Sequence, residues 1–336
     1  MNDLHYFEYY SQLQHQQNML QDTKRTITYR NAIMSNPSRF ENKLVLDVGA
    51  GSGILSFFAV QAGATHVYAV EASTMAHQMQ TLIQHNPSFQ DKITIIHAKI
   101  EQSDLQIPMV DTILSEPIGV FLFHERMLES YIYARDHYLK PGGTLFPSAG
   151  RIHLSPFTDS KLWKETSANA DFWKQDSFLG INLSALHTDA CHELFNMPVV
   201  GQFDHRSILT NDKNTHDIDF NTITLDALQD MTIPIRWKSS RTGMMHGIAG
   251  WFDIVFAPTG GIPISLSTSP DTEQTHWYQT RFLWLDPLPI KAHQVIEGSM
   301  RCQANDARSY TITVDVTVGE IQRNGIWQLQ DQTFTQ

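Results

Sequence analysis

The chain of 336 residues has only two cysteines, Cys191 and Cys302, which lie far apart in the sequence. So few thiols exclude a disulfide framework and fit a reducing compartment. No run of about 18 uncharged apolar residues occurs, which excludes a membrane-spanning helix. The first residues also lack the basic-then-apolar order of a secretory signal. No His-Glu-x-x-His motif is present, so we expect no metal site. We therefore expect a protein of the cytoplasm, the nucleus or both.

The charge balance is acidic, with 24 Lys and Arg against 35 Asp and Glu and a formal net charge of −11. This excess of negative charge repels phosphates, so the composition argues against direct binding of nucleic acid. An acidic surface suits a basic peptide partner, although most acidic surfaces serve solubility alone. The length allows two domains with separate hydrophobic cores.

The first half of the chain predicts helices followed by an α/β domain. Residues 1–40 are rich in Gln and Met, with a weak apolar periodicity that predicts helices. In residues 41–147, apolar runs such as Leu44–Val48 alternate with helical stretches such as Ile54–Ala62, which predicts a parallel, doubly wound sheet. A helix over Phe123–Leu139 is expected to stop at the Lys-Pro-Gly-Gly segment that follows. Further strands are predicted at Thr65–Val70, Lys92–His97 and Val110–Leu114, with a helix near Thr74–His85.

Residues 148–336 have a different character, with short runs of β-branched and aromatic residues separated by turn residues. This pattern predicts an antiparallel β domain, which can close into a barrel. Within it, about residues 159–192 form a helical and loop-like insertion, whose aromatic side chains need a surface to bury against. The expected strands are Gly247–Phe256, Gln279–Leu285, Gln294–Arg301 and Ser309–Val318.

A glycine-rich loop, Gly49-Ala50-Gly51-Ser52-Gly53, follows the first predicted strand. Glycine lets the backbone approach a ligand closely and adopt positive φ without strain. The dinucleotide fingerprint needs its third glycine one position later, so this loop suits an adenosyl amino acid better than a pyrophosphate. Glu71, about 20 residues farther on, can accept hydrogen bonds from both ribose hydroxyls. Its alternative role is that of an acid favoured at a helix N-terminus. The loop and Glu71 together favour nucleoside binding.

Two glutamates flank a proline–glycine bend after the fourth predicted strand. Glu116 precedes Pro117 and Gly119, and Glu125 follows the bend. The bend can bring both carboxylates to the carboxyl edge of the parallel sheet, where ligands bind. Adjacent anions repel each other, and a planar guanidinium between them removes the conflict through bidentate hydrogen bonds. The alternative is that Glu125 caps the following helix while Glu116 pairs with a nearby base.

At these residues the sequence resembles the protein arginine N-methyltransferases, and within them the coactivator-associated, type I branch. Ser115-Glu116-Pro117 with His124–Glu129 is similar to the family's double-glutamate loop. Thr275-His276-Trp277 is similar to its Thr-His-Trp loop, and Tyr6, Phe7 and Tyr10 to its N-terminal aromatic motif. The likeness covers essentially the whole chain as a catalytic core. It implies a Rossmann-like domain that binds S-adenosylmethionine, a β-barrel domain and an inserted dimerisation arm.

The resemblance also implies roles for single residues. Arg25 is expected to bind the methionine carboxylate, Glu101 the adenine amino group, and Asp22 the side chain of His276. The predicted N-terminal helix that carries Arg25 departs from the coactivator-associated branch at Lys24, where that branch usually has a valine. The implied catalytic set is Glu116, Glu125, His276 and Asp22, and the implied substrate-binding set is Tyr10, Glu116, Glu125, Met127, His276 and Trp277. The implied cofactor-binding set is Tyr6, Phe7, Gln16, Met19, Arg25, Asp47, Gly49, Gly51, Gly53, Glu71, Ala72, Lys99, Ile100, Glu101, Glu116, Met127 and Ser130.

The reaction that the resemblance implies moves a methyl group from S-adenosylmethionine to arginine and leaves S-adenosylhomocysteine. Its products would be monomethylarginine and asymmetric dimethylarginine, with Met19 and Met127 biasing the outcome. Arginine is a poor nucleophile because it stays protonated and its lone pairs are delocalised. The two glutamates are therefore expected to hold positive charge on the nitrogens that do not attack. The departing proton can pass to His276 with Asp22, or to one of the glutamates.

The implied partners are arginine-containing proteins, such as histone tails and RNA-binding proteins, and a second copy of the chain in a homodimer. Two other classes stay open on the sequence alone. A methyltransferase for a small molecule would keep the glycine loop and Glu71 without needing the paired glutamates. A non-catalytic scaffold that binds the cofactor would use the aromatic insertion only to dimerise. Trp277, taken alone, is better explained by ordinary core packing than by a place in the site.

Overall fold

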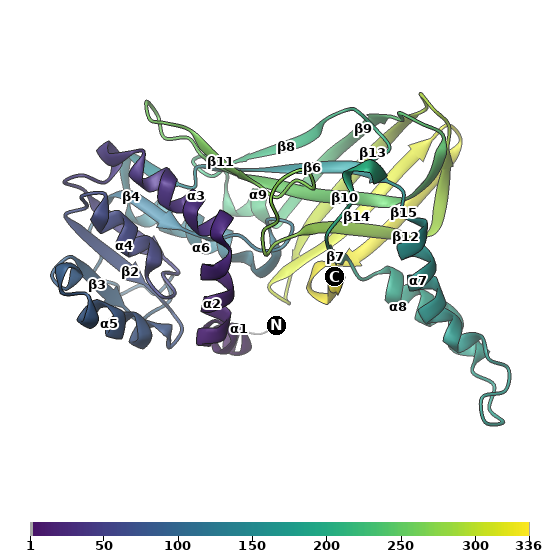
Figure 1. Cartoon of the computed structure of the whole chain (residues 1–336), viewed down its shortest axis with the longest axis horizontal. Helices are drawn as coiled ribbons and strands as arrows, with labels where there is room; N and C mark the ends of the chain where they lie inside the picture. Colours follow the sequence, from purple (N-terminus) through teal and green to yellow (C-terminus); the bar gives the residue numbers. More distant parts are fainter. Residues whose placement is uncertain (1–2, 336) are drawn as a thin grey trace.

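The computed structural model describes residues 3–335, with a helical N-terminal segment, a parallel α/β domain and a β-rich domain (Figure 1). Residues 1, 2 and 336, which fall inside the predicted segments, lie outside the described residues. Helices α1 (Asp3–Tyr10), α2 (Leu13–Gln21) and α3 (Thr23–Met34) confirm the helical prediction for the N-terminal segment. Within the described part of the chain, no helix combines the length and the apolar character needed to cross a membrane.

The parallel sheet has the strand order β3-β2-β1-β4-β5, which confirms the doubly wound prediction. The chain leaves β1 toward β2 on one side and later returns to β4 on the other. The loops after β1 and β4 therefore open side by side, at the position where ligands bind in such sheets. The strands are β1 (Leu44–Val48), β2 (His66–Val70), β3 (Ile93–Ile96), β4 (Val110–Ser115) and β5 (Leu139–Phe146). The helices are α4 (Ile54–Gln61), α5 (Met75–His85) and α6 (Met127–Tyr138), with short 3-10 turns at Pro37–Arg39, Pro87–Phe89 and His124–Arg126.

Two predictions in this domain were wrong in detail. The helix expected over Phe123–Leu139 begins only at Met127, because Glu125 and Arg126 have φ values of 75° and 56°, which break the helical hydrogen-bond pattern. The Lys-Pro-Gly-Gly segment ends the helix as expected, but it belongs to strand β5, where the pairing with β4 shifts register. The loop between β4 and α6, residues 116–126, is called the double-glutamate loop below.

The second domain is built from two sheets. One has the order β16-β7-β12-β10-β6-β8 with β11 beside β10, and the other has the order β15-β14-β13-β9. Contacts between the edge strands β8 and β9, and between β12 and the edge strand β15, bring the two sheets together, so the barrel forms from two sheets. All pairs are antiparallel except β16 with β7. The strands are β6 (Ala149–Phe157), β7 (Val199–Gly201), β8 (Asn214–Asp219), β9 (Asp230–Lys238), β10 (Gly243–Phe256), β11 (Ile264–Ser267), β12 (Gln279–Ile290), β13 (Val295–Asn305), β14 (Ser309–Val318), β15 (Ile321–Gln328) and β16 (Thr333–Thr335), with the short helix α9 (Leu225–Gln229) before β9.

The predicted insertion between β6 and β7 is helical. Helices α7 (Ser160–Asp171) and α8 (His187–Phe195) lead to a loop that projects away from the rest of the molecule (Figure 1). Leu179 and Ile181 at the tip of this arm are 90% and 64% exposed. The tip of the arm therefore presents apolar side chains to solvent.

Helix α3 joins the N-terminal segment to the β domain. The Lys24 ammonium donates to the Ser267 carbonyl at 2.6 Å, the Glu273 carbonyl at 2.6 Å and the Thr272 hydroxyl at 2.8 Å. At the other end of the helix, Asn36 exchanges two hydrogen bonds with the backbone of Ile262. These contacts hold β11 and the chain on either side of it against α3.

Candidate active site

A central cavity of about 360 Å³ lies where the N-terminal helices, the parallel sheet and the double-glutamate loop meet. The glycine loop Gly49–Gly53 and the double-glutamate loop reach it from neighbouring strands, as the strand order predicts. Most of the predicted site residues line it: Tyr6, Phe7, Tyr10, Gln16, Met19, Arg25, Gly49, Gly51, Glu71, Ala72, Lys99, Ile100, Glu101, Glu116, Glu125, Met127 and Ser130.

Glu71 and the glycine loop form one hydrogen-bonded unit. The two carboxylate oxygens of Glu71 accept the backbone N–H groups of Gly51 and Ser73, each at 2.7 Å. Gly49 and Gly51 have φ values of 69° and 55°, and a Cβ on either would lie within 2.9 Å of the Met127 or Gln16 side chain. A side chain at either position would therefore strain the backbone and displace Met127 or Gln16.

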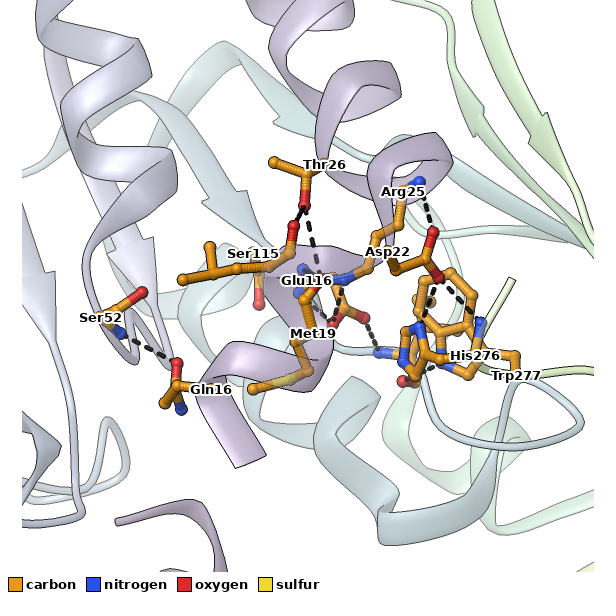
Figure 2. A network of polar contacts seen from close by, with 12 residues as sticks. Gln16, Met19, Asp22, Arg25, Thr26, Ser52, Ser115, Glu116, His276 and Trp277 are labelled. Carbon is orange, nitrogen blue, oxygen red and sulfur yellow. Dashed lines mark hydrogen bonds and ion pairs between the residues drawn. The ribbon is translucent and has the colours of Figure 1, made fainter. Parts of the chain in front are cut away.

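Arg25 and Glu116 form a buried ion pair at the base of the cavity (Figure 2). The Arg25 Nε and Nη2 atoms both donate to Oε2 of Glu116, at 3.1 and 2.6 Å. Burial opposes the charge on Arg25, but Glu116 outweighs it and raises the pKa of the guanidinium. The other Glu116 oxygen accepts the Ile118 N–H at 3.1 Å. Glu116 thus pairs with a nearby base, Arg25, as the alternative interpretation of the sequence expected. Glu116 nevertheless lines the cavity.

Glu125 faces the same cavity as Glu116. Its Oε2 accepts the Tyr10 hydroxyl at 2.5 Å, and its backbone has a φ of 75°. Burial raises the pKa of Glu125 to about 7; the Tyr10 hydrogen bond works against that rise and Glu116 adds to it. Glu125 therefore does not cap helix α6. The bend brings two carboxylates to one cavity, with Glu125 ready to exchange a proton near neutral pH.

His276 and Asp22 lie beside this cavity rather than on its wall. Oδ2 of Asp22 accepts the backbone N–H of His276 at 2.8 Å and contacts its ring Nδ1 at 2.7 Å (Figure 2). Oδ1 of the same carboxylate caps α3 by accepting the Arg25 N–H at 2.9 Å. Burial opposes ionisation of Asp22, but the hydrogen bonds from His276 and Arg25 prevail and lower its pKa. The structure therefore brings the expected pair together.

Besides Asp22 and His276, three more predicted site residues do not line the cavity. Asp47, on β1, is fully buried; it accepts the Ser56 hydroxyl at 2.6 Å, and burial raises its pKa to about 7. Gly53 packs against Met79 at the start of α4, so its missing side chain serves helix packing. Trp277 is only 2% exposed, and its indole N–H donates to the Ile118 carbonyl at 3.0 Å. Trp277 therefore packs in the core and supports the double-glutamate loop without reaching the cavity.

The sequence did not reveal one charged residue of the cavity wall. Arg308, on the turn between β13 and β14, reaches the cavity from the β domain, and its guanidinium carbon lies 4.3 Å from the ring centre of Tyr6. No motif distinguishes this arginine from the others in the chain, so only the packing of the two domains could have found it. The remaining unpredicted wall residues are Leu20, Val48, Ala50, Ser52, Ile54, Leu55, Val70, Ala98 and Ile118.

Family models match both parts of the molecule. Residues 148–319 match the arginine methyltransferase oligomerization subdomain, and residues 32–128 match the ribosomal protein L11 methyltransferase (PrmA). A probable histone-arginine methyltransferase CARM1 of Oryza sativa subsp. indica is 48% identical over 309 residues, covering 91% of this chain and 58% of the relative. A histone-arginine methyltransferase CARMER of Drosophila ananassae is 46% identical over 313 residues, covering 93% of this chain and 58% of the relative. The chain thus spans 58% of the length of these curated relatives.

Solved structures agree with these matches. The Trypanosoma brucei PRMT1 enzyme-prozyme heterotetrameric complex with AdoHcy superimposes with a TM-score of 0.83 at 31% sequence identity. The match covers 95% of this chain and 99% of that one. The fold, the converging glutamates and the family model over the β domain point the same way. The chain belongs to the protein arginine methyltransferase family.

Proposed function

We propose that this chain is the catalytic core of an enzyme that methylates arginine side chains of proteins, with S-adenosylmethionine as the methyl donor. The main support for this proposal is that Glu116 and Glu125 face one cavity, together with the glycine loop and Glu71. A methyltransferase for a small neutral molecule does not need two converging carboxylates, and a scaffold gains nothing from burying them. An enzyme that binds a guanidinium, a flat cation with hydrogen-bond donors in fixed directions, does need two converging carboxylates.

The cavity wall fits an adenosyl amino acid. Gly49 and Gly51 leave room for close approach, and Glu71 is held in place to accept from ribose hydroxyls. Ser130 donates to Glu101 at 2.5 Å, which positions that carboxylate for an adenine amino group. Arg25 is the cation for the amino acid carboxylate. When bound, S-adenosylmethionine supplies a methyl group already activated by its sulfonium.

The two glutamates orient and polarise the substrate guanidinium. Glu125 is held by Tyr10, and Glu116 is held by Arg25 and the Ile118 N–H, so neither carboxylate needs to reorganise on binding. Bidentate contacts to these anions keep positive charge on the nitrogens they touch and leave the attacking nitrogen less charged. Tyr6, Tyr10 and Met127 on the wall exclude water, which strengthens these interactions.

Glu125 is the group we assign to receive the proton that leaves the guanidinium. It borders the cavity, and its pKa of about 7 lets it act as a base near neutral pH. His276 lies beside the cavity and is held by Asp22, so its role is to position the neighbouring loop. The products are monomethylarginine and asymmetric dimethylarginine, with Met19 and Met127 limiting the space around the acceptor nitrogen.

We infer that two copies of the chain form a homodimer through the arm. The support is the apolar tip, where Leu179 and Ile181 are open to solvent, and the family model over this domain, which describes an oligomerization subdomain. Leu179→Asp with Ile181→Asp should convert a dimer to a monomer in sedimentation experiments. A native chain that sediments as a monomer would contradict the proposal.

Arginines in basic protein tails are the proposed substrates, with histones first and RNA-binding proteins second. The curated relatives are named histone-arginine methyltransferases, and the net charge of −11 favours encounter with basic segments. Action on histones would place the protein in the nucleus, in addition to the cytoplasm.

The deciding experiment incubates the chain with methyl-labelled S-adenosylmethionine and an arginine-rich histone-tail peptide. The matched control peptide carries lysine in place of every arginine. Label is expected on the arginine peptide alone, and hydrolysis should release methylated arginine. Label on the lysine peptide, on free small molecules, or nowhere would reject the proposal and favour one of the two alternatives.

A further inference from the structure

The turn between β13 and β14 is bound to the double-glutamate loop on both sides of Glu125. His124 Nδ1 contacts the Ser309 hydroxyl at 2.9 Å, and Arg126 donates to the Asn305 carbonyl at 2.8 Å. The residues that flank Glu125 in the sequence therefore hold the ends of the turn that carries Arg308. Two loops from different domains are thus locked in a fixed relationship around the cavity.

Arg308 has a backbone conformation that this turn must impose. Its φ is 54°, in the left-handed region that residues other than glycine rarely adopt. Such a conformation persists only where surrounding contacts hold it, and it occurs often at functional sites. Within the turn, the Asn305 side chain accepts the Ala307 N–H at 3.0 Å. The strained geometry directs the Arg308 side chain to the cavity wall.

Arg308 is connected to Glu125 through the aromatic residues of α1. Its guanidinium carbon lies 4.3 Å from the ring centre of Tyr6, a cation–π contact. The ring centres of Tyr6 and Tyr10 lie 4.8 Å apart, and the Tyr10 hydroxyl donates to Glu125 at 2.5 Å. Tyr6 is almost fully buried, so the contact lies out of water, where such an interaction is strongest.

We propose that Arg308 is a positioning residue of the β domain, which holds the aromatic residues of α1 closed over the central cavity and places a positive charge beside Glu125. This role rests on the proposed function, because the closed cavity is the one that receives cofactor and substrate. The charged or titratable groups around Glu125 are Tyr6 and Tyr10 on α1, Glu116 in the loop, and Arg308 from the β domain. Burial raises the pKa of Glu125, and Arg308 is the cation that counters this rise.

The test compares Arg308→Met with Arg308→Lys, which keeps the charge and can still contact the ring. Arg301→Met is the matched control, because Arg301 lies on the same hairpin in an exposed ion pair with Asp230. The first measurement is chymotryptic cleavage after Tyr9 and Tyr10 in the absence of any cofactor. Cleavage should be about fivefold faster in Arg308→Met, as expected for loss of one cation–π contact, and close to native in the other two variants.

Two further measurements test the role in the site. Titration with S-adenosylhomocysteine should show about fivefold weaker binding to Arg308→Met, with most of the affinity kept by Arg308→Lys. The acid limb of the methyl-transfer rate should move to higher pH in Arg308→Met and stay in place in Arg301→Met.

Native cleavage and affinity in Arg308→Met would overturn this inference, and so would losses in Arg308→Lys as large as those in Arg308→Met. A native chain that binds no S-adenosylhomocysteine would instead overturn the proposed function, while the cleavage experiment would still report on the contact with α1.

Discussion

Asp22 and His276 lie 254 positions apart in the sequence, yet one carboxylate oxygen of Asp22 contacts both the backbone N–H and the ring Nδ1 of His276. The same carboxylate caps α3, the helix that carries Arg25. Because Arg25 in turn holds Glu116, one aspartate connects the loop before β12, the N-terminal helices and the double-glutamate loop. The site is therefore a property of the assembled domains.

Replacement of Asp22 by Asn should disrupt this connection. An amide offers a single acceptor oxygen, so either the helix cap or the contact with His276 is lost, and a buried donor is left unpaired. We expect methyl transfer to fall by about 10- to 100-fold, since an unsatisfied buried group costs about 1–3 kcal/mol. The measurement is kcat/KM with an arginine peptide. Asp22→Asn activity within twofold of native would mean that the pair has no part in the reaction.

Glu125 should impose a pH dependence on the reaction. Because burial raises its pKa to about 7, the carboxylate of the free enzyme is neutral below that pH and anionic above it. Only the anion can bind a guanidinium and accept its proton, so kcat/KM should increase tenfold per pH unit below about 7 and level off above it. A flat rate between pH 6 and pH 8 would contradict this reading.

Glu125→Gln should nearly abolish methyl transfer and leave the affinity for S-adenosylhomocysteine close to native. The amide keeps the shape and still accepts the Tyr10 hydroxyl, but it lacks the charge. We expect a rate at least about 100-fold lower, the effect typical of losing a general base or a preorganised charge. Binding of S-adenosylhomocysteine that falls as far as the rate would instead show that Glu125 is structural.

Met127→Phe should shift the products toward monomethylarginine. Met127 lies against Gly49 on the cavity wall, and a larger rigid ring would crowd the acceptor nitrogen once it carries one methyl group. Crowding worth about 1.4 kcal/mol would lower the ratio of dimethyl to monomethyl product by about tenfold. Mass spectrometry of the peptide measures this ratio. Met127→Leu, which nearly conserves volume, is the control and should leave the ratio within about twofold of native.

Lys24→Met should loosen the segment that precedes His276. The ammonium group makes three hydrogen bonds to the end of β11 and the segment that follows it, and methionine keeps the apolar stem without any donor. We expect faster hydrogen exchange over residues 267–276 and a loss of stability of about 1 kcal/mol. Lys92→Met, at an exposed position, is the control. Equal rates of hydrogen exchange over residues 267–276 in both variants would show that Lys24 does not hold this segment in place.

Local patterns in the sequence were enough for many of the elements, and the family resemblance supplied most of the cavity wall. Strand–helix alternation predicted the parallel sheet, and the spacing of the glycines placed the loop beside Glu71, because both signals depend on neighbouring residues. Strands with polar interruptions, such as β8 and β15, were not predicted, because they pair only where the rest of the sheet presents partners. The left-handed conformation of Glu125 and Arg126 likewise follows from packing, and it shortened the predicted helix α6.

Residue types and spacing by themselves predicted that a glycine loop and an acidic strand end lie at one edge of a sheet, where two carboxylates can join them. Only the tertiary structure decided which way individual side chains point. Asp47 faces Ser56, Trp277 supports Ile118 from behind, and Arg308 reaches the cavity from another domain. The physical reason is that side-chain direction at the end of an element depends on contacts with distant segments, which no local pattern records.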